Sequence, residues 1–133
     1  MKKTKKMTLF LTMVMCFTMV LGMTVSAASQ DSRTVAGMQV TGVSQKGNYY
    51  GWGQTSYPAS ASLTVDVGYT YIHGTGNGEA YTSKAYTGDR KTVVSATANK
   101  KSEHTVNIRN TSVSSTHYVN YNGQSASFST NVN

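Results

Sequence analysis

The chain has 133 residues, with 12 basic against 5 acidic side chains, a formal net charge of +7 and a single cysteine. This length suits one domain, and a single cysteine excludes an intramolecular disulfide. The basic excess is concentrated at the start of the chain, so it does not by itself indicate a nucleic-acid partner.

The first 27 residues have the order of a bacterial-type secretory signal peptide. Four lysines lie among the first six residues, an apolar run spans residues 7–25, and Ser26 and Ala27 are small. An uncleaved membrane anchor is the alternative, because the apolar run is almost long enough to span a bilayer. We predict cleavage after Ala27, which removes Cys16. The secreted chain then has about 106 residues and a formal charge of about +3.

The remaining chain has the composition of a sheet protein with a thin core. Leu63 is its only leucine, whereas Val, Tyr, Thr, Ser, Asn and Gly are abundant. β-Branched and aromatic residues favour strands. We expect a flexible tail at residues 28–32 and a single domain at residues 33–133, which begins with a short strand at 33–43 interrupted at Gly37 and Gly42.

Residues 45–58 are rich in glycine and aromatic residues and lack a clear periodicity, which predicts a long loop. Loops of this length are uncommon in compact domains unless they are functional or disordered. Aromatic rings on such a loop can stack on sugar rings, while polar side chains bind the hydroxyls. The alternative is that Trp52 and one tyrosine fold inward and cap the core. The candidate ligand-binding residues are Tyr49, Tyr50, Trp52, Gln54 and Tyr57.

Residues 60–71 show the longest two-residue alternation in the chain. Ala61, Leu63, Val65, Val67, Tyr69 and Tyr71 are expected to face inward. Ser62, Thr64, Asp66, Gly68 and Thr70 are expected to face water. A turn at residues 73–78 precedes a returning strand at 79–87, where Lys84 suits an edge position.

The last third of the chain predicts further strands. After a turn at 87–90 and a strand at 91–98, we expect a hairpin over 104–121 that reverses at residues 110–111 and places His104 opposite His117. An Asn122-Gly123 turn then leads into a strand at 125–132. Two facing imidazoles could hold a metal. No third ligand is evident, so we favour two rings that close the end of the core, and we predict no metal and no cofactor.

About seven short strands without a helical pattern favour an all-β fold, an antiparallel β-sandwich, with a small β-barrel as the second choice. The chain contains no Gly-x-Ser-x-Gly elbow and no pair of acids placed for acid and base catalysis, so we predict that it is not an enzyme.

These features predict a secreted binding protein that acts at or outside the cell envelope, on cell-wall polysaccharide or another envelope component, through the aromatic residues of the predicted loop. The alternative is a bacteriocin or pore-forming toxin that acts on membranes through amphipathic β-hairpins, because residues 60–71 have the length of a membrane-spanning strand. A nucleic-acid partner is not expected at a charge near +3.

Overall fold

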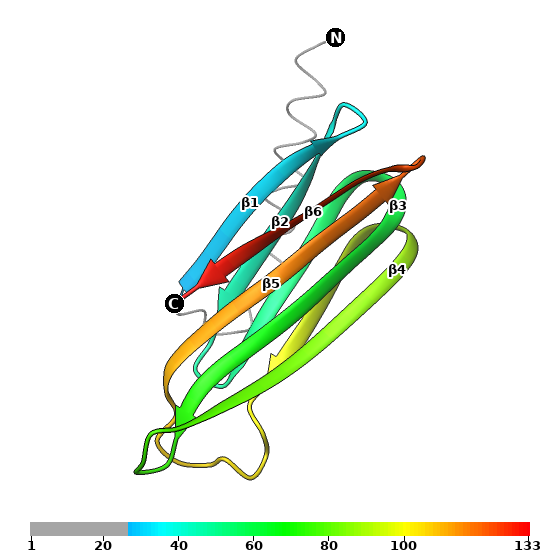
Figure 1. Ribbon diagram of the computed structural model, residues 1–133. Helices are drawn as coiled ribbons and strands as arrows, with labels where there is room; N and C mark the ends of the chain where they lie inside the picture. The colour runs from blue at the N-terminus through cyan, green and yellow to red at the C-terminus, as the bar shows by residue number, and fades with distance from the viewer. Residues whose placement is uncertain (1–26) are drawn as a thin grey trace.

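The computed structural model describes residues 27–133, which form six antiparallel strands and no helix (Figure 1). The strands are β1 (Ala27–Val35), β2 (Met38–Lys46), β3 (Tyr50–His73), β4 (Gly78–Asn99), β5 (Arg109–Tyr121) and β6 (Gln124–Val132). The described part of the chain contains no helix that is long and apolar enough to cross a membrane. The predicted signal peptide at residues 1–27 lies, except for Ala27, outside the described residues.

The strands form one antiparallel sheet that nearly closes into a barrel. Its order is β1-β2-β3-β5-β6, and β4 pairs with β3 alone. Figure 1 shows β1 and β6, the two ends of this order, lying beside each other. The predicted all-β architecture is therefore confirmed. The predicted sandwich of seven short strands is not confirmed, and the sheet is closer to the barrel that was the second choice.

Strands β3 and β4 are long because each bends and continues on the facing wall. The pairing register of β3 shifts between Ser56 and Ala61, around Pro58. A hydrogen bond of 2.9 Å joins the two sides of this bend, from the hydroxyl of Thr55 to the carbonyl of Thr64. The turn predicted at residues 87–90 is the matching irregularity in β4, where Arg90 has a φ of 54°. The predicted strands at 79–87 and 91–98 are thus the two halves of β4.

The alternation at residues 60–71 supplies the centre of the core, as predicted. Leu63, Val65, Val67, Tyr69 and Tyr71 are each 0 % exposed. Full burial of one such side chain contributes roughly 1.5–3 kcal/mol to folding. Lys84 lies on β4, at the edge of the sheet, which agrees with the edge position predicted for it.

Several turns and ends differ from the sequence-based expectation. The predicted tail at 28–32 lies inside β1 and pairs with β2. The predicted strand at 33–43 is divided by a turn at Ala36 and Gly37, whose φ angles are 48° and 74°. The Asn122-Gly123 turn is confirmed, with φ angles of 51° and 79° and with Tyr121 paired to Gln124.

The predicted loop at residues 45–58 is mostly strand. Only residues 47–49 lie between β2 and β3. At the start of β3, two inward-facing positions are glycines, Gly51 and Gly53. The opposite wall of the barrel comes so close to them that it leaves no room for a side chain. A Cβ on Gly51 would lie 2.7 Å from Val113 Cγ2, and one on Gly53 would lie 2.7 Å from Ser115 Oγ. Glycine at these positions removes the apolar alternation by which a strand is recognised.

The predicted hairpin over residues 104–121 is wrong in its first half. Residues 100–108 are irregular, and β5 begins at Arg109 and pairs with β3 and β6. His104 and His117 therefore do not face each other. His117 lies in the barrel interior, whereas His104 lies in the loop between β4 and β5.

Candidate functional site

Two of the five predicted ligand-binding residues are buried. Tyr57 is 2 % exposed, its hydroxyl donates a hydrogen bond of 2.7 Å to the Val35 carbonyl, and its ring packs against Tyr121 at a centroid distance of 5.4 Å. Gln54 is 6 % exposed. Tyr57 thus folds inward and caps the core, as the alternative expected of one tyrosine, but Trp52, which the same alternative placed in the core, does not.

Of the other three residues, two share one face of a strand and the third lies in a turn. Tyr50 and Trp52 alternate with the inward-facing Gly51 and Gly53, so they lie on the outer face of β3, where both are half-buried. The Tyr50 ring covers the Gly47 position, and burial raises the pKa of Tyr50. Tyr49 is 57 % exposed, in the turn before β3. The structure does not bring these five residues together into one site.

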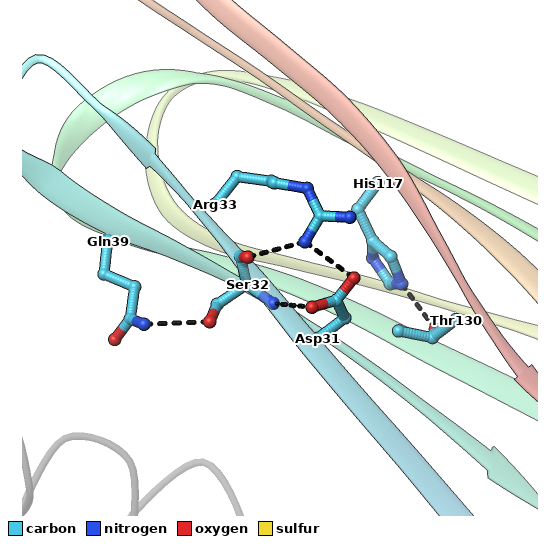
Figure 2. Close-up of polar contacts among 6 residues, drawn as sticks. All are labelled: Asp31, Ser32, Arg33, Gln39, His117 and Thr130. Atoms are coloured by element: carbon cyan, nitrogen blue, oxygen red, sulfur yellow. Dashed lines mark hydrogen bonds and ion pairs between the residues drawn. The ribbon is translucent and has the colours of Figure 1, made fainter.

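A chain of polar groups crosses the barrel interior from β3 to β6. The Thr55 hydroxyl lies 2.9 Å from His117 Nδ1, and His117 Nε2 lies 2.8 Å from the Thr130 hydroxyl. Thr130 also contacts Ser44, whose hydroxyl oxygen lies 2.7 Å from that of Ser115. Figure 2 shows His117 and Thr130 beside Asp31 and Arg33, which form an ion pair of 2.8 Å on β1.

The tautomer of His117 follows from its partners. The carbonyl of Thr64 only accepts, so the Thr55 hydroxyl donates to it and must itself accept from Nδ1–H. In the neutral ring, Nε2 then accepts from Thr130. Burial lowers the pKa of His117 to about 4, although the Asp31 carboxylate acts in the opposite direction. The ring is therefore neutral near pH 7.

This interior chain is closed to ligands. Ser44, Thr55, Ser115 and His117 are 0 % exposed and Thr130 is 2 % exposed. A nucleophile must be within reach of its substrate, and none of these hydroxyls is. We infer that these interior side chains serve to hydrogen-bond one another within the core, because buried donors and acceptors without partners are costly.

His104 has a histidine partner, but it is His73 at the end of β3. The two rings stack with centroids 3.5 Å apart and 11° between their planes. The Tyr71 hydroxyl lies 2.7 Å from His104 Nδ1. A metal ion lies in the plane of each imidazole that binds it, so two parallel rings at this distance cannot share one. Among residues 27–133 no group of three or more His, Cys, Asp or Glu side chains could hold a metal ion.

A shallow groove of about 200 Å³ lies on the outer face of the wall formed by β4, β3, β5 and β6. Along its floor, Gly68 on β3 pairs with Ser114 on β5, and Ser114 pairs with Asn131 on β6. Tyr81 on β4 is 60 % exposed and its ring lies across Gly68. The groove is lined by Asp66, Gly68, Thr70, Tyr81, Ser112, Val113, Ser114, Thr116, Asn131 and Asn133.

The lining of the groove combines one aromatic face with many short polar groups. Thr70, Ser112, Ser114 and Thr116 supply hydroxyls, Asn131 and Asn133 supply amides, and Asp66 supplies the one charged side chain. Such groups donate and accept hydrogen bonds in several directions, and an exposed tyrosine ring provides an apolar plane. The groove contains no Lys or Arg, so it does not suit an anionic ligand.

Among the groove residues, Asp66, Gly68 and Thr70 were predicted from the sequence to face water. The polar residues of β5 join them through the lateral pairing of β3 with β5, which the sequence did not predict. A signal was present in Gly68, which interrupts the polar face of an otherwise regular strand, because glycine in a strand often marks a close approach. The sequence did not reveal that Tyr81 covers this glycine.

No protein-family model matches the chain, and no curated protein and no solved structure is significantly similar to it.

Proposed function

We propose that the protein is a secreted, non-enzymatic binding protein that acts at or outside the cell envelope and binds a neutral glycan, with cell-wall polysaccharide as its ligand. The outer groove, rather than the predicted aromatic loop, is its binding site. The single observation that supports this proposal is the exposed Tyr81 ring beside a row of hydroxyl and amide groups.

The charge and chemistry of the groove support a sugar over other ligands. A sugar ring offers a C–H face that packs on an aromatic ring and several hydroxyls that need donors and acceptors. Asp66 can accept two hydroxyl hydrogens, and Ser114 and Asn131 can each donate and accept. Phosphate or a uronic acid would lack a cationic partner in the groove and would be repelled by Asp66.

Sedimentation with purified insoluble cell wall tests the proposal. We expect the chain from residue 28 to pellet with the wall and Tyr81→Ala to bind about tenfold more weakly, or by about 1.4 kcal/mol, because the variant loses the aromatic face on which a sugar ring packs. Tyr86→Ala is the matched control, since Tyr86 lies on the same strand, is 48 % exposed and does not line the groove. Equal binding by both variants, or none by the parent chain, would reject the proposal.

The alternative, a bacteriocin or pore-forming toxin, requires more rearrangement. A membrane-spanning hairpin from β3 would have to expose Leu63, Val65 and Val67 to lipid, and these residues are 0 % exposed in the nearly closed barrel. Dye release from anionic liposomes tests this alternative, and release at submicromolar protein would favour it over glycan binding.

A further inference from the structure

Three connections meet at one end of the barrel, and we call residues 47–49, 74–77 and 100–108 the loop end. The amide of Lys100 donates to the Tyr49 carbonyl over 2.8 Å, and the amide of Gly74 donates to the Val106 carbonyl over 3.1 Å. The guanidinium of Arg109 donates to the carbonyls of Gly74 and Gly76 over 2.7 and 2.6 Å. These bonds hold the three connections together as one surface.

The loop end carries two exposed apolar side chains that do not belong to any strand. Five large hydrophobic residues are exposed in the described part of the chain, and three of them are on the edge strand β4. The other two, Tyr49 at 57 % and Val106 at 60 %, are both in the loop end. Neither is in the core cluster or among the partly buried residues packed against it.

Basic residues lie in and beside the loop end. Lys100 and Lys101 belong to the loop itself, and the Lys100 ammonium lies 5.8 Å from the centre of the Tyr49 ring. Arg109 begins β5 beside the turn at 74–77. Glu103 is the one acid within the loop end. The surface is therefore basic, with two apolar tips that point to solvent.

We propose that the loop end docks on the surface of an anionic lipid bilayer. The negative surface of such a bilayer attracts Lys and Arg side chains, and a tyrosine ring is suited to the headgroup region. A hydrated anionic polymer would attract the lysines equally but would gain nothing from Val106. The two exposed apolar residues therefore favour a bilayer. This contact lies at the bilayer surface, opens no pore, and is separate from the groove.

Co-sedimentation with vesicles tests this docking, using residues 28–133, which include all six strands and the core between them. Vesicles of phosphatidylglycerol mixed with phosphatidylcholine are compared with vesicles of phosphatidylcholine alone. We expect binding to the anionic vesicles only. Absence of that binding, or equal binding to both vesicle types, would overturn the proposal.

Two pairs of matched variants locate the contact. We expect Tyr49→Ser with Val106→Ser to weaken vesicle binding about tenfold, since the variant loses the apolar groups that the bilayer would bury. Tyr86→Ser with Val93→Ser removes the same side chains from β4 and should have no effect. Lys100→Gln with Lys101→Gln should weaken vesicle binding at low salt. Lys84→Gln with Lys91→Gln removes the same charge from β4 and should leave vesicle binding unchanged.

Two further results would overturn the proposal. The first is an equal loss of binding in the β4 control variants, which would show that the contact is not located at the loop end. The second is full binding by the Tyr49 and Val106 variant together with competition by soluble polyphosphate, which would identify an anionic polymer as the ligand. Vesicle binding should persist in Tyr81→Ala, so failure of the docking proposal and failure of the glycan proposal are distinguishable.

Discussion

The ring of Tyr81 on β4 lies across Gly68 on β3. A Cβ on Gly68 would lie 2.8 Å from the phenolic oxygen of Tyr81 and 2.9 Å from its Cε2 atom. The two residues are diagonal neighbours, because Thr70, not Gly68, is the direct partner of Tyr81. The glycine thus allows the aromatic ring to lie over the sheet and form one side of the groove.

Adding a methyl group at Gly68 should displace the Tyr81 ring. We expect Gly68→Ala to weaken glycan binding about tenfold while the free energy of unfolding changes by less than about 1 kcal/mol, since alanine is also better than glycine in a strand. Gly76→Ala is the control, because nothing lies within 4 Å of its Cβ position. Titration calorimetry measures the first effect and urea unfolding the second. Unchanged binding by Gly68→Ala would show that the ring position is irrelevant.

The interior chain predicts a stability difference between two identical substitutions on β3. Thr55→Val removes a buried hydroxyl that serves both His117 and the Thr64 carbonyl, so it should lower the free energy of unfolding by about 1–3 kcal/mol. Thr64→Val removes a hydroxyl that bonds Thr87 on the exposed face, and it should change stability by less than about 0.5 kcal/mol. Urea denaturation measures both variants. Equal losses would contradict the role assigned to the interior chain.

His117 should make the protein sensitive to acid. Its pKa is about 4 when folded and near 6.5 when unfolded, so between these values the unfolded chain binds more protons. This contribution to stability is complete above about pH 6.5 and decreases as the pH falls toward 4, by roughly 3 kcal/mol in all. Unfolding free energies between pH 4 and 7 measure it. His117→Gln should lack this part of the slope, and an equal slope in the variant would contradict the assignment.

The stacked rings of His73 and His104 predict that a change at His73 alters the pKa of His104. Burial lowers the pKa of His104, and the charge of His73 lowers it further. His73→Gln removes that charge and opens one face of the His104 ring to water, so the pKa of His104 should rise toward its ordinary value. An NMR titration of the imidazole resonances measures this change. A His104 pKa that is unchanged or lower in the variant would show that the rings do not interact in solution.

The strands that could be predicted from the sequence are those whose core-facing residues have large side chains. Strand residues 60–71 were predicted because valine, leucine and tyrosine alternate with polar residues. The first half of β3 was missed because its inward positions, Gly51 and Gly53, have no side chain to show the period. Conversely, Val106 and Ile108 imitate a strand period, although only Ile108 packs against the core.

The candidate site was less predictable, because it depends on which strands are neighbours. The groove joins β3, β4, β5 and β6 at residues that are far apart in sequence and individually ordinary. The aromatic segment was conspicuous in sequence, yet the barrel uses Tyr57 for its core and separates Tyr49 from Trp52. Local composition therefore identified a β protein with polar outer faces, and the lateral pairing of the strands formed the groove.

Backbone NMR of the chain from residue 28, titrated with soluble neutral oligosaccharides released from cell wall, tests the central claim most directly. Glycan binding in the groove predicts shifts of the Gly68, Tyr81, Ser114 and Asn131 amides, with little change at residues 49–57. Shifts confined to residues 49–57, or no shifts at millimolar sugar, would contradict the groove as the binding site.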